Sequence, residues 1–127
     1  MEAITSDFLK DFLKRKDIEL QPTHEKLCLP IINRLAKKMT LGIKFNAINV
    51  ADGVIVDGHH RYLASLVSGA DLEKRPYVRP AACVVTNWQS VSFDESDWDT
   101  EAKIQKLNIE DAEYNGIDIQ EIMKLIN

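Results

Sequence analysis

The spacing of the apolar positions changes within one stretch, residues 53–68. Its first part, Val54-Ile55-Val56, is a β-branched run typical of a buried strand. The dipeptide Asp57-Gly58 then favours a turn. From His59 onwards, apolar residues recur at helical spacing, at positions 62, 63, 66 and 67. The pattern predicts a strand, a tight turn and a helix over residues 59–68, with the polar side chains gathered in the turn.

The rest of the chain alternates between helical and strand-like patterns without an internal repeat. Helices are expected over residues 4–16, from a cap at Thr23 to about Gly42, and over residues 59–68, 100–114 and 118–126. Pro30 should either kink the second helix or begin a fresh one. Strands are expected over residues 18–20, 45–50, 54–56 and, buried, 81–86, with a hairpin turn at 51–53 and a polar loop over 71–80. This order predicts an α/β (α+β) fold with a small mixed sheet flanked by helices.

The chain of 127 residues is long enough for one domain with a proper core. We expect this domain to span residues 1–127, with its core at about residues 18–90, a helix before the core and an acidic helical tail after it. Residues 1–90 carry a net charge of +3, and residues 91–127 carry a net charge of −7. The acidic tail does not favour nucleic-acid binding by the whole surface, although it leaves room for one basic groove.

The sequence has no feature that predicts a membrane or secreted protein. No apolar run approaches the length of a membrane span, and the first residues lack the basic start and apolar centre of a signal peptide. We therefore expect a cytoplasmic protein. Cys28 and Cys83 do not have metal-ligand spacing, and each lies among apolar residues, so both are expected to be buried thiols.

The predicted turn gathers residues that suit an anionic ligand. Gly58 would let the backbone approach a ligand closely, and the N–H groups of the first helical turn attract anions. Arg61 adds a planar guanidinium that suits phosphate or carboxylate, and His59 and His60 could move a proton. Structural roles compete with this interpretation: Asp57 could cap the helix, and one histidine could be a core residue with its hydrogen bonds satisfied.

The predicted order of elements resembles that of the ParB/sulfiredoxin superfamily, which includes the ParB-like nuclease domains. It consists of a helix, Gly42, a strand, a turn, a second strand and then Asp57-Gly58-His59-His60-Arg61-Tyr62-Leu63-Ala64. The similarity covers roughly residues 18–86, and the Asp-Gly-His-His-Arg run is similar to that of ParB-like free-serine kinases. The resemblance implies a nucleotide-phosphate site at Gly58, His59, His60 and Arg61. His59 stands where sulfiredoxins carry a cysteine, so reduction of a sulfinic cysteine is not expected. The chain also has no room for the helix-turn-helix domain of ParB partition proteins.

The residues and the resemblance together predict a nucleotide-dependent phosphotransferase or hydrolase that uses ATP, ADP or CTP with Mg²⁺. Residues 58–61 would hold a β- or γ-phosphate, and His59 or His60 would stabilise or protonate the developing charge. Asp57 would help to hold Mg²⁺, directly or through water. The resemblance to the free-serine kinases implies Glu25 as a base. The competing interpretation of His24 and Glu25 is a surface pair in a first helical turn.

Two other functions are compatible with the same residues. A ParB-like nuclease, of a toxin-like kind for example, would use His59 and His60 as acid and base on a phosphodiester. A non-catalytic module would sense a nucleotide and contact a protein partner, or a second copy of the chain, through the acidic tail. A metal centre made by the two histidines is disfavoured, because adjacent residues on a helix point in different directions.

The tail has too many apolar residues for a disordered arm, so residues 100–126 are expected to fold back on the sheet or on a helix edge of the core. Trp98 and Tyr114 would anchor it, since each combines a large apolar area with a polar tip. The apolar residues of the tail are Leu107, Ile117, Ile119, Ile122, Met123, Leu125 and Ile126.

Overall fold

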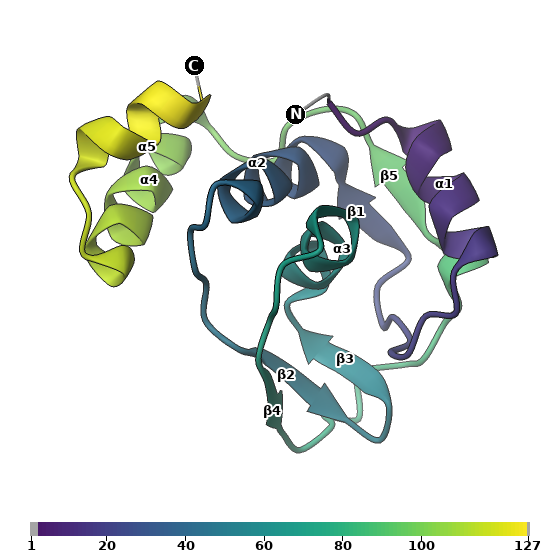
Figure 1. Cartoon of the computed structure of the whole chain (residues 1–127). Coiled ribbons are helices and arrows are strands. Elements are labelled where there is room, and N and C mark those ends of the chain that lie inside the picture. The colour runs from purple at the N-terminus through teal and green to yellow at the C-terminus, as the bar shows by residue number, and fades with distance from the viewer. Residues whose placement is uncertain (1–2, 127) are drawn as a thin grey trace.

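Five α-helices and two small sheets form the part of the chain that the structure describes (Figure 1). The structure is a computed structural model that describes residues 3–126, with side chains up to residue 124. The helices are α1 (Ser6–Arg15), α2 (Leu29–Thr40), α3 (His59–Ser68), α4 (Glu101–Asn115) and α5 (Ile119–Ile126). The strands are β1 (Lys26–Cys28), β2 (Ile48–Ala51), β3 (Val54–Asp57), β4 (Lys74–Pro76) and β5 (Ser92–Asp94), and a 3₁₀ turn, η1, spans Trp88–Ser90. The mixed α and β class is confirmed. No described helix is long and apolar enough to cross a membrane.

A hairpin at Asp52-Gly53 joins the two central strands of the larger sheet, as the sequence predicted. Both residues have positive φ, 51° and 77°, which suits the tight turn between the antiparallel strands β2 and β3. β4 pairs in parallel with the other side of β2, which gives the order β3-β2-β4. β1 and β5 form a separate parallel pair. The expected small mixed sheet is therefore present, but a second sheet lies beside it.

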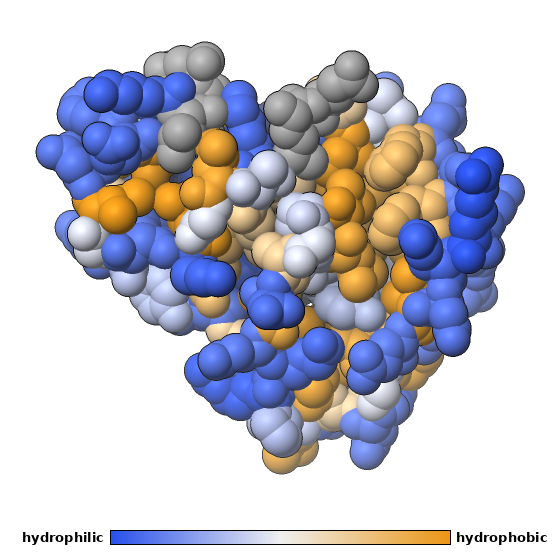
Figure 2. All heavy atoms as spheres, in the orientation of Figure 1, coloured by the Kyte–Doolittle hydropathy of each residue, from blue (hydrophilic) through white to orange (hydrophobic). Residues whose placement is uncertain are grey.

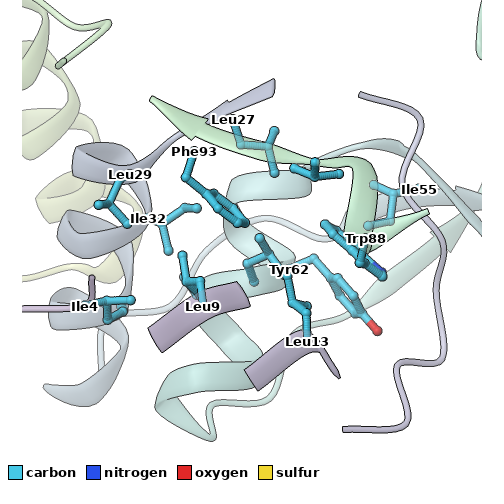
Figure 3. Packing of buried hydrophobic residues seen from close by; sticks show 14 of the residues in the cluster. Ile4, Leu9, Leu13, Leu27, Leu29, Ile32, Ile55, Tyr62, Trp88 and Phe93 are labelled. Atoms are coloured by element: carbon cyan, nitrogen blue, oxygen red, sulfur yellow. The ribbon is translucent and has the colours of Figure 1, made fainter. Parts of the chain in front are cut away.

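The main core lies between α1, α2, α3 and the two sheets, and Figure 3 shows its side chains. α2 and α3 pack closely against each other. Two buried aromatic residues bring their polar tips to one backbone segment: Tyr62 Oη accepts from the Leu20 N–H at 3.2 Å, and Trp88 Nε1 donates to the Leu20 carbonyl at 2.8 Å. These bonds explain why the strand expected over residues 18–20 is wrong, since the backbone groups of Leu20 bond to side chains and not to a ladder.

α2 begins later than predicted. Pro30 lies in its first turn, so the alternative of a fresh helix near this proline is correct. Thr23 does not cap a helix, because its hydroxyl donates to the Ile55 carbonyl at 2.8 Å and residues 26–28 form β1. His24 and Glu25 are consequently in a loop before a strand, not in a first helical turn.

The strand expected over residues 81–86 is also wrong. Val84 is 69% exposed, and the backbone turns so that the Cys83 N–H bonds to the Pro80 carbonyl at 3.0 Å. The segment bonds to the rest of the chain through the Thr86 N–H, which donates to the Pro22 carbonyl at 2.9 Å. Residues 71–80, which were expected to form a polar loop, in contrast contain the short strand β4. Of the two free cysteines, Cys28 is buried and Cys83 is not.

The C-terminal hairpin of α4 and α5 lies beside α2, on the side away from α1 (Figure 1). α4 ends and α5 begins on either side of the predicted break, where Gly116 has a φ of 63°. Figure 2 shows hydrophilic residues over the outer surface of this hairpin and apolar residues between its two helices. The tail therefore folds back on a helix edge, as expected. Its buried apolar residues, Ala112 and Ile122, pack with Ile43 in a second small apolar cluster, with Phe45 and Ile119 at the edge of this cluster.

Of the two anchors expected for the tail, Tyr114 is wrong, because its side chain is 57% exposed. Trp98 is 47% exposed and does not insert into the core, but its ring meets the His60 ring edge-on with centroids 5.6 Å apart, and its backbone N–H donates to Sγ of Cys28 at 3.4 Å. Ile122 on α5 takes this role, with no exposed area. The side chains of Leu125 and Ile126 lie outside the described residues.

Candidate functional site

The turn between β3 and α3 has a glycine because of packing within the protein. Gly58 has φ 107° and ψ 27°, a left-handed conformation that other residues rarely adopt. A Cβ at this position would lie 2.4 Å from Cγ2 of Ile48. The predicted reason for this glycine, the close approach of a ligand, is therefore not required. Asp57 does not cap α3 either, because the cap residue is Gly58 and no side chain bonds to the first turn.

His59 and His60 both accept a hydrogen bond from a distant backbone N–H. Nε2 of His59 accepts from Thr23 at 2.9 Å, and Nε2 of His60 accepts from Cys28 at 2.9 Å. A ring nitrogen that accepts is unprotonated, so each ring is neutral and carries its proton on Nδ1. Burial is the main cause that lowers the pKa of His59 to about 3 and that of His60 to about 4, with a further contribution from the charge of His24. Both rings are therefore neutral donors at neutral pH.

The first turn of α3 has unpaired backbone donors. The carbonyl of Gly58 accepts from Tyr62 at 2.9 Å, which closes the first helical turn. The N–H groups of His59, His60 and Arg61 have no acceptor among residues 3–126. Such a set of N–H groups at the positive end of a helix dipole favours an anion.

Arg61 is more involved in the fold than the sequence indicated. One of its terminal nitrogens donates to the carbonyls of Asn46 at 2.9 Å and Ala47 at 3.2 Å. The other lies 3.6 Å from Oδ2 of Asp57, whose side chain is 71% exposed. Arg61 therefore holds the segment before β2 against α3, and only part of its guanidinium remains for a ligand.

A cavity of about 380 Å³ opens beside this turn. Residues 57–61 line one side of it, together with His24, Phe45, Trp98 and Asp99. One face of α2 contributes Ile31, Arg34, Leu35 and Lys38. One face of α4 contributes Ile104, Leu107, Asn108 and Asp111, at the same helical spacing. The structure thus brings together all the predicted site residues except Glu25.

Three ion pairs join the α2 side of the cavity to the acidic tail. Arg34 pairs with Asp97 and, at 2.9 Å, with Asp99. Burial opposes its charge, but the hydrogen bonds and charges of both carboxylates outweigh burial and raise the pKa of Arg34. Lys38, which is 5% exposed, pairs with Asp111 at 2.7 Å. The acidic tail therefore balances the basic side chains of the cavity.

His24 takes the place that was expected for Glu25. Its ring stacks on His59, with centroids 4.2 Å apart and planes 11° apart. It is exposed, lines the cavity and makes no hydrogen bond in the described chain. Glu25 does not line the cavity, and its contact is a backbone one, from the Ser92 N–H to the Glu25 carbonyl at 2.8 Å. The group that is available for proton transfer is consequently His24.

Asp57 is the exposed carboxylate of the cavity that could bind a metal ion. Among residues 3–126, no three His, Cys, Asp or Glu side chains are grouped to hold a metal. A Mg²⁺ ion bound through a nucleotide needs only one or two protein carboxylates, because it keeps water and phosphate ligands. Asp57 fits that requirement, since its contact with Arg61 is long and its side chain is largely exposed.

The sequence did not indicate that α2 and α4 would contribute to this site. Arg34, Lys38 and Asp111 carry no local motif, and they meet only because the tail docks on α2. Asn108 has no exposed area, and its Oδ1 has no hydrogen-bond partner among the described residues. The available signal was the matching i, i+3, i+4, i+7 spacing on both helices, with basic residues on α2 and acidic residues in the tail.

The cavity does not by itself identify a family. No protein-family model, curated protein or solved structure matches this chain.

Proposed function

We propose that the protein binds a nucleotide in this cavity, with the phosphates at the N-terminus of α3. The main support is the set of unpaired N–H groups of His59, His60 and Arg61 beside a cavity of about 380 Å³. The neutral rings of His59 and His60 add Nδ1–H donors without adding charge. The resemblance to the ParB/sulfiredoxin superfamily supports the same site, and we propose that the chain has this fold.

We further propose that the protein is a phosphotransferase or hydrolase that uses ATP, ADP or CTP with Mg²⁺. Asp57 would hold the metal ion, which would neutralise charge on the phosphates when bound. His24 would act as the general base toward an attacking hydroxyl group or water, in place of Glu25. His59 and His60 would act as hydrogen-bond donors, because burial keeps them neutral.

The nuclease alternative has less support. It needs His59 and His60 as an acid and base pair, but Nε2 of each ring is already bonded to a backbone N–H. Within the cavity, the ion pairs of Arg34 and Lys38 with the tail also neutralise two basic side chains that a nucleic-acid backbone would need. A module that only senses the nucleotide would share the binding site, so turnover separates it from an enzyme.

Calorimetry with ATP, ADP, CTP and inorganic triphosphate, each with and without Mg²⁺, tests binding. We expect Mg²⁺ to strengthen binding in the wild-type chain and to have a much smaller effect in Asp57→Asn. Asp52→Asn is the matched control, because Asp52 lies in the β2–β3 turn and does not line the cavity. Absence of binding for every ligand would refute the proposed site.

Phosphorus NMR of bound ATP, with water or free serine as the acceptor, tests catalysis. We expect His24→Gln to lower turnover roughly 100-fold or more, as for loss of a general base. Glu25→Gln should leave turnover unchanged, since this carboxylate does not line the cavity. Binding without turnover in the wild-type chain would leave a nucleotide-sensing module as the function.

A further inference from the structure

The slot between α2 and α4 is the part of the cavity that a phosphate group would not occupy. Ile31 and Leu35 on α2, and Ile104 and Leu107 on α4, line a common space but are only half-buried. The two helices are not closely packed, and the ion pair of Lys38 and Asp111 joins them. Aliphatic side chains on both walls of one space suit a flat apolar group.

Asn108 is a polar residue in this apolar slot. It lies on the same face of α4 as Ile104 and Leu107, and its side chain has no exposed area. Its Nδ2 lies 3.9 Å from Sδ of Met123, a weak acceptor, and its Oδ1 has no partner in the described chain. A buried acceptor without a partner destabilises a fold, and such groups call for a specific explanation. A ligand that brings an N–H donor to Oδ1 of Asn108 would explain why this acceptor has no partner within the protein.

We propose that this slot binds the nucleobase and that Asn108 accepts a hydrogen bond from the exocyclic amino group of adenine or cytosine. The inference rests on the proposed nucleotide site, because the phosphates at the N-terminus of α3 place the base deeper in the same cavity. An asparagine amide matches the donor and acceptor edge of adenine, with Oδ1 toward the amino group. The aliphatic residues of α2 and α4 cover the faces of the ring. The acidic tail is then part of the ligand site and determines base preference.

Two matched nucleotide pairs test the amino group. In inosine triphosphate a carbonyl replaces the amino group of ATP and the adjacent ring nitrogen N1 carries a proton, and UTP differs from CTP in the same way at C4 and N3. Calorimetry with Mg²⁺ should give binding roughly tenfold tighter for the amino member of at least one pair, the effect of one good hydrogen bond. In Asn108→Leu the ratio of the two dissociation constants in that pair should fall to about one, and the affinity for inorganic triphosphate should not change.

Two controls separate recognition from folding. Gln105→Leu adds the same side chain to the exposed side of α4 and should keep the wild-type preference. Asn108→Leu removes a buried acceptor without a partner, so its melting temperature should equal or exceed that of the wild type. The comparison of ATP with inosine triphosphate on the wild-type chain needs no variant at all.

The outcomes distinguish this inference from the function on which it rests. Equal binding of both members in each pair would overturn the role of Asn108. Binding of inorganic triphosphate as tight as that of ATP would overturn base binding in the slot and leave the phosphate site in place. No binding of any of these ligands would overturn both. A preference for the amino member that persists in Asn108→Leu would assign recognition to another residue and refute the proposal.

Discussion

Nζ of Lys38 lies 2.7 Å from Oδ2 of Asp111, and the two side chains are 5% and 17% exposed. This ion pair joins α2 to α4 across the cavity. A pair so far removed from water is sensitive to the loss of one partner, since the remaining charge has no compensation. It therefore contributes to the docking of the acidic tail as well as to the wall of the site.

Lys38→Met should lower the free energy of unfolding by about 2–3 kcal/mol, less than a fully buried pair would lose, because Asp111 retains some solvent contact. Lys37→Met is the matched control, since Lys37 has no ion pair in the described chain, and it should change stability by less than about 0.5 kcal/mol. Urea denaturation measures both. The double variant Lys38→Met with Asp111→Leu should recover part of the loss, and an equal loss in all three variants would contradict the assignment.

The histidines of α3 should make the fold less stable in mild acid. Their pKa values in the fold, about 3 for His59 and about 4 for His60, are below the ordinary value of 6.5. As pH falls below about 6.5, the unfolded chain binds protons that the folded chain does not bind, so stability decreases. The decrease continues to the folded pKa values and amounts to at most about 1.4 kcal/mol per pH unit for each ring.

Proton NMR of the imidazole signals checks this directly. The signals of His59 and His60 should not titrate between about pH 5.5 and 8 in the folded protein. Urea midpoints measured over the same range should fall toward the acid end. Titration of either ring near its ordinary pKa would show that the bonds from Thr23 and Cys28 do not persist in solution.

Gly58→Ala should be far more costly than Gly69→Ala. Both glycines have positive φ, 107° and 78°, so both variants incur backbone strain of about 1 kcal/mol. Only at position 58 would the new Cβ collide with another residue, Ile48, and overpacking adds about 1–3 kcal/mol. Thermal denaturation of the two variants separates strain from collision. Equal losses would mean that the turn has room, and that a ligand could be the reason for the glycine after all.

Local signals were sufficient for the centre of the fold. The β-branched run at 54–56, the turns at Asp52-Gly53 and Asp57-Gly58, and the helical spacing after His59 each act within a few residues, and all were predicted correctly. The strand expected near Leu20 failed because its backbone bonds to Tyr62 and Trp88, residues distant in sequence.

The candidate site was predicted only as far as its local turn. The state of His59 and His60 depends on backbone donors 36 and 32 residues away in sequence, which no local pattern reveals. The contribution of Asn108 and Asp111 depends on how the tail docks, and that docking involves Ile43 and Ile122. Sequence spacing can show that one face of α4 is partly apolar, but it cannot show which helix that face meets.

Removal of the tail after Ser96 should leave a folded but less stable chain. The main core contains no residue beyond Phe93, so its buried side chains all remain. The cut removes Ala112 and Ile122, which exposes Ile43 and leaves Lys38 without Asp111. We expect a lower melting temperature and reduced solubility, with loss of the nucleotide preference assigned to Asn108.

A second cut after Asn115 removes only α5 and should have a smaller effect, because the ion pair of Lys38 is kept. Melting curves and size-exclusion chromatography of both shortened chains show whether the longer deletion lowers stability and solubility more than the shorter one. If the longer deletion gave a soluble monomer as stable as the full chain, the tail would not pack on α2, and it would instead be an arm for a partner.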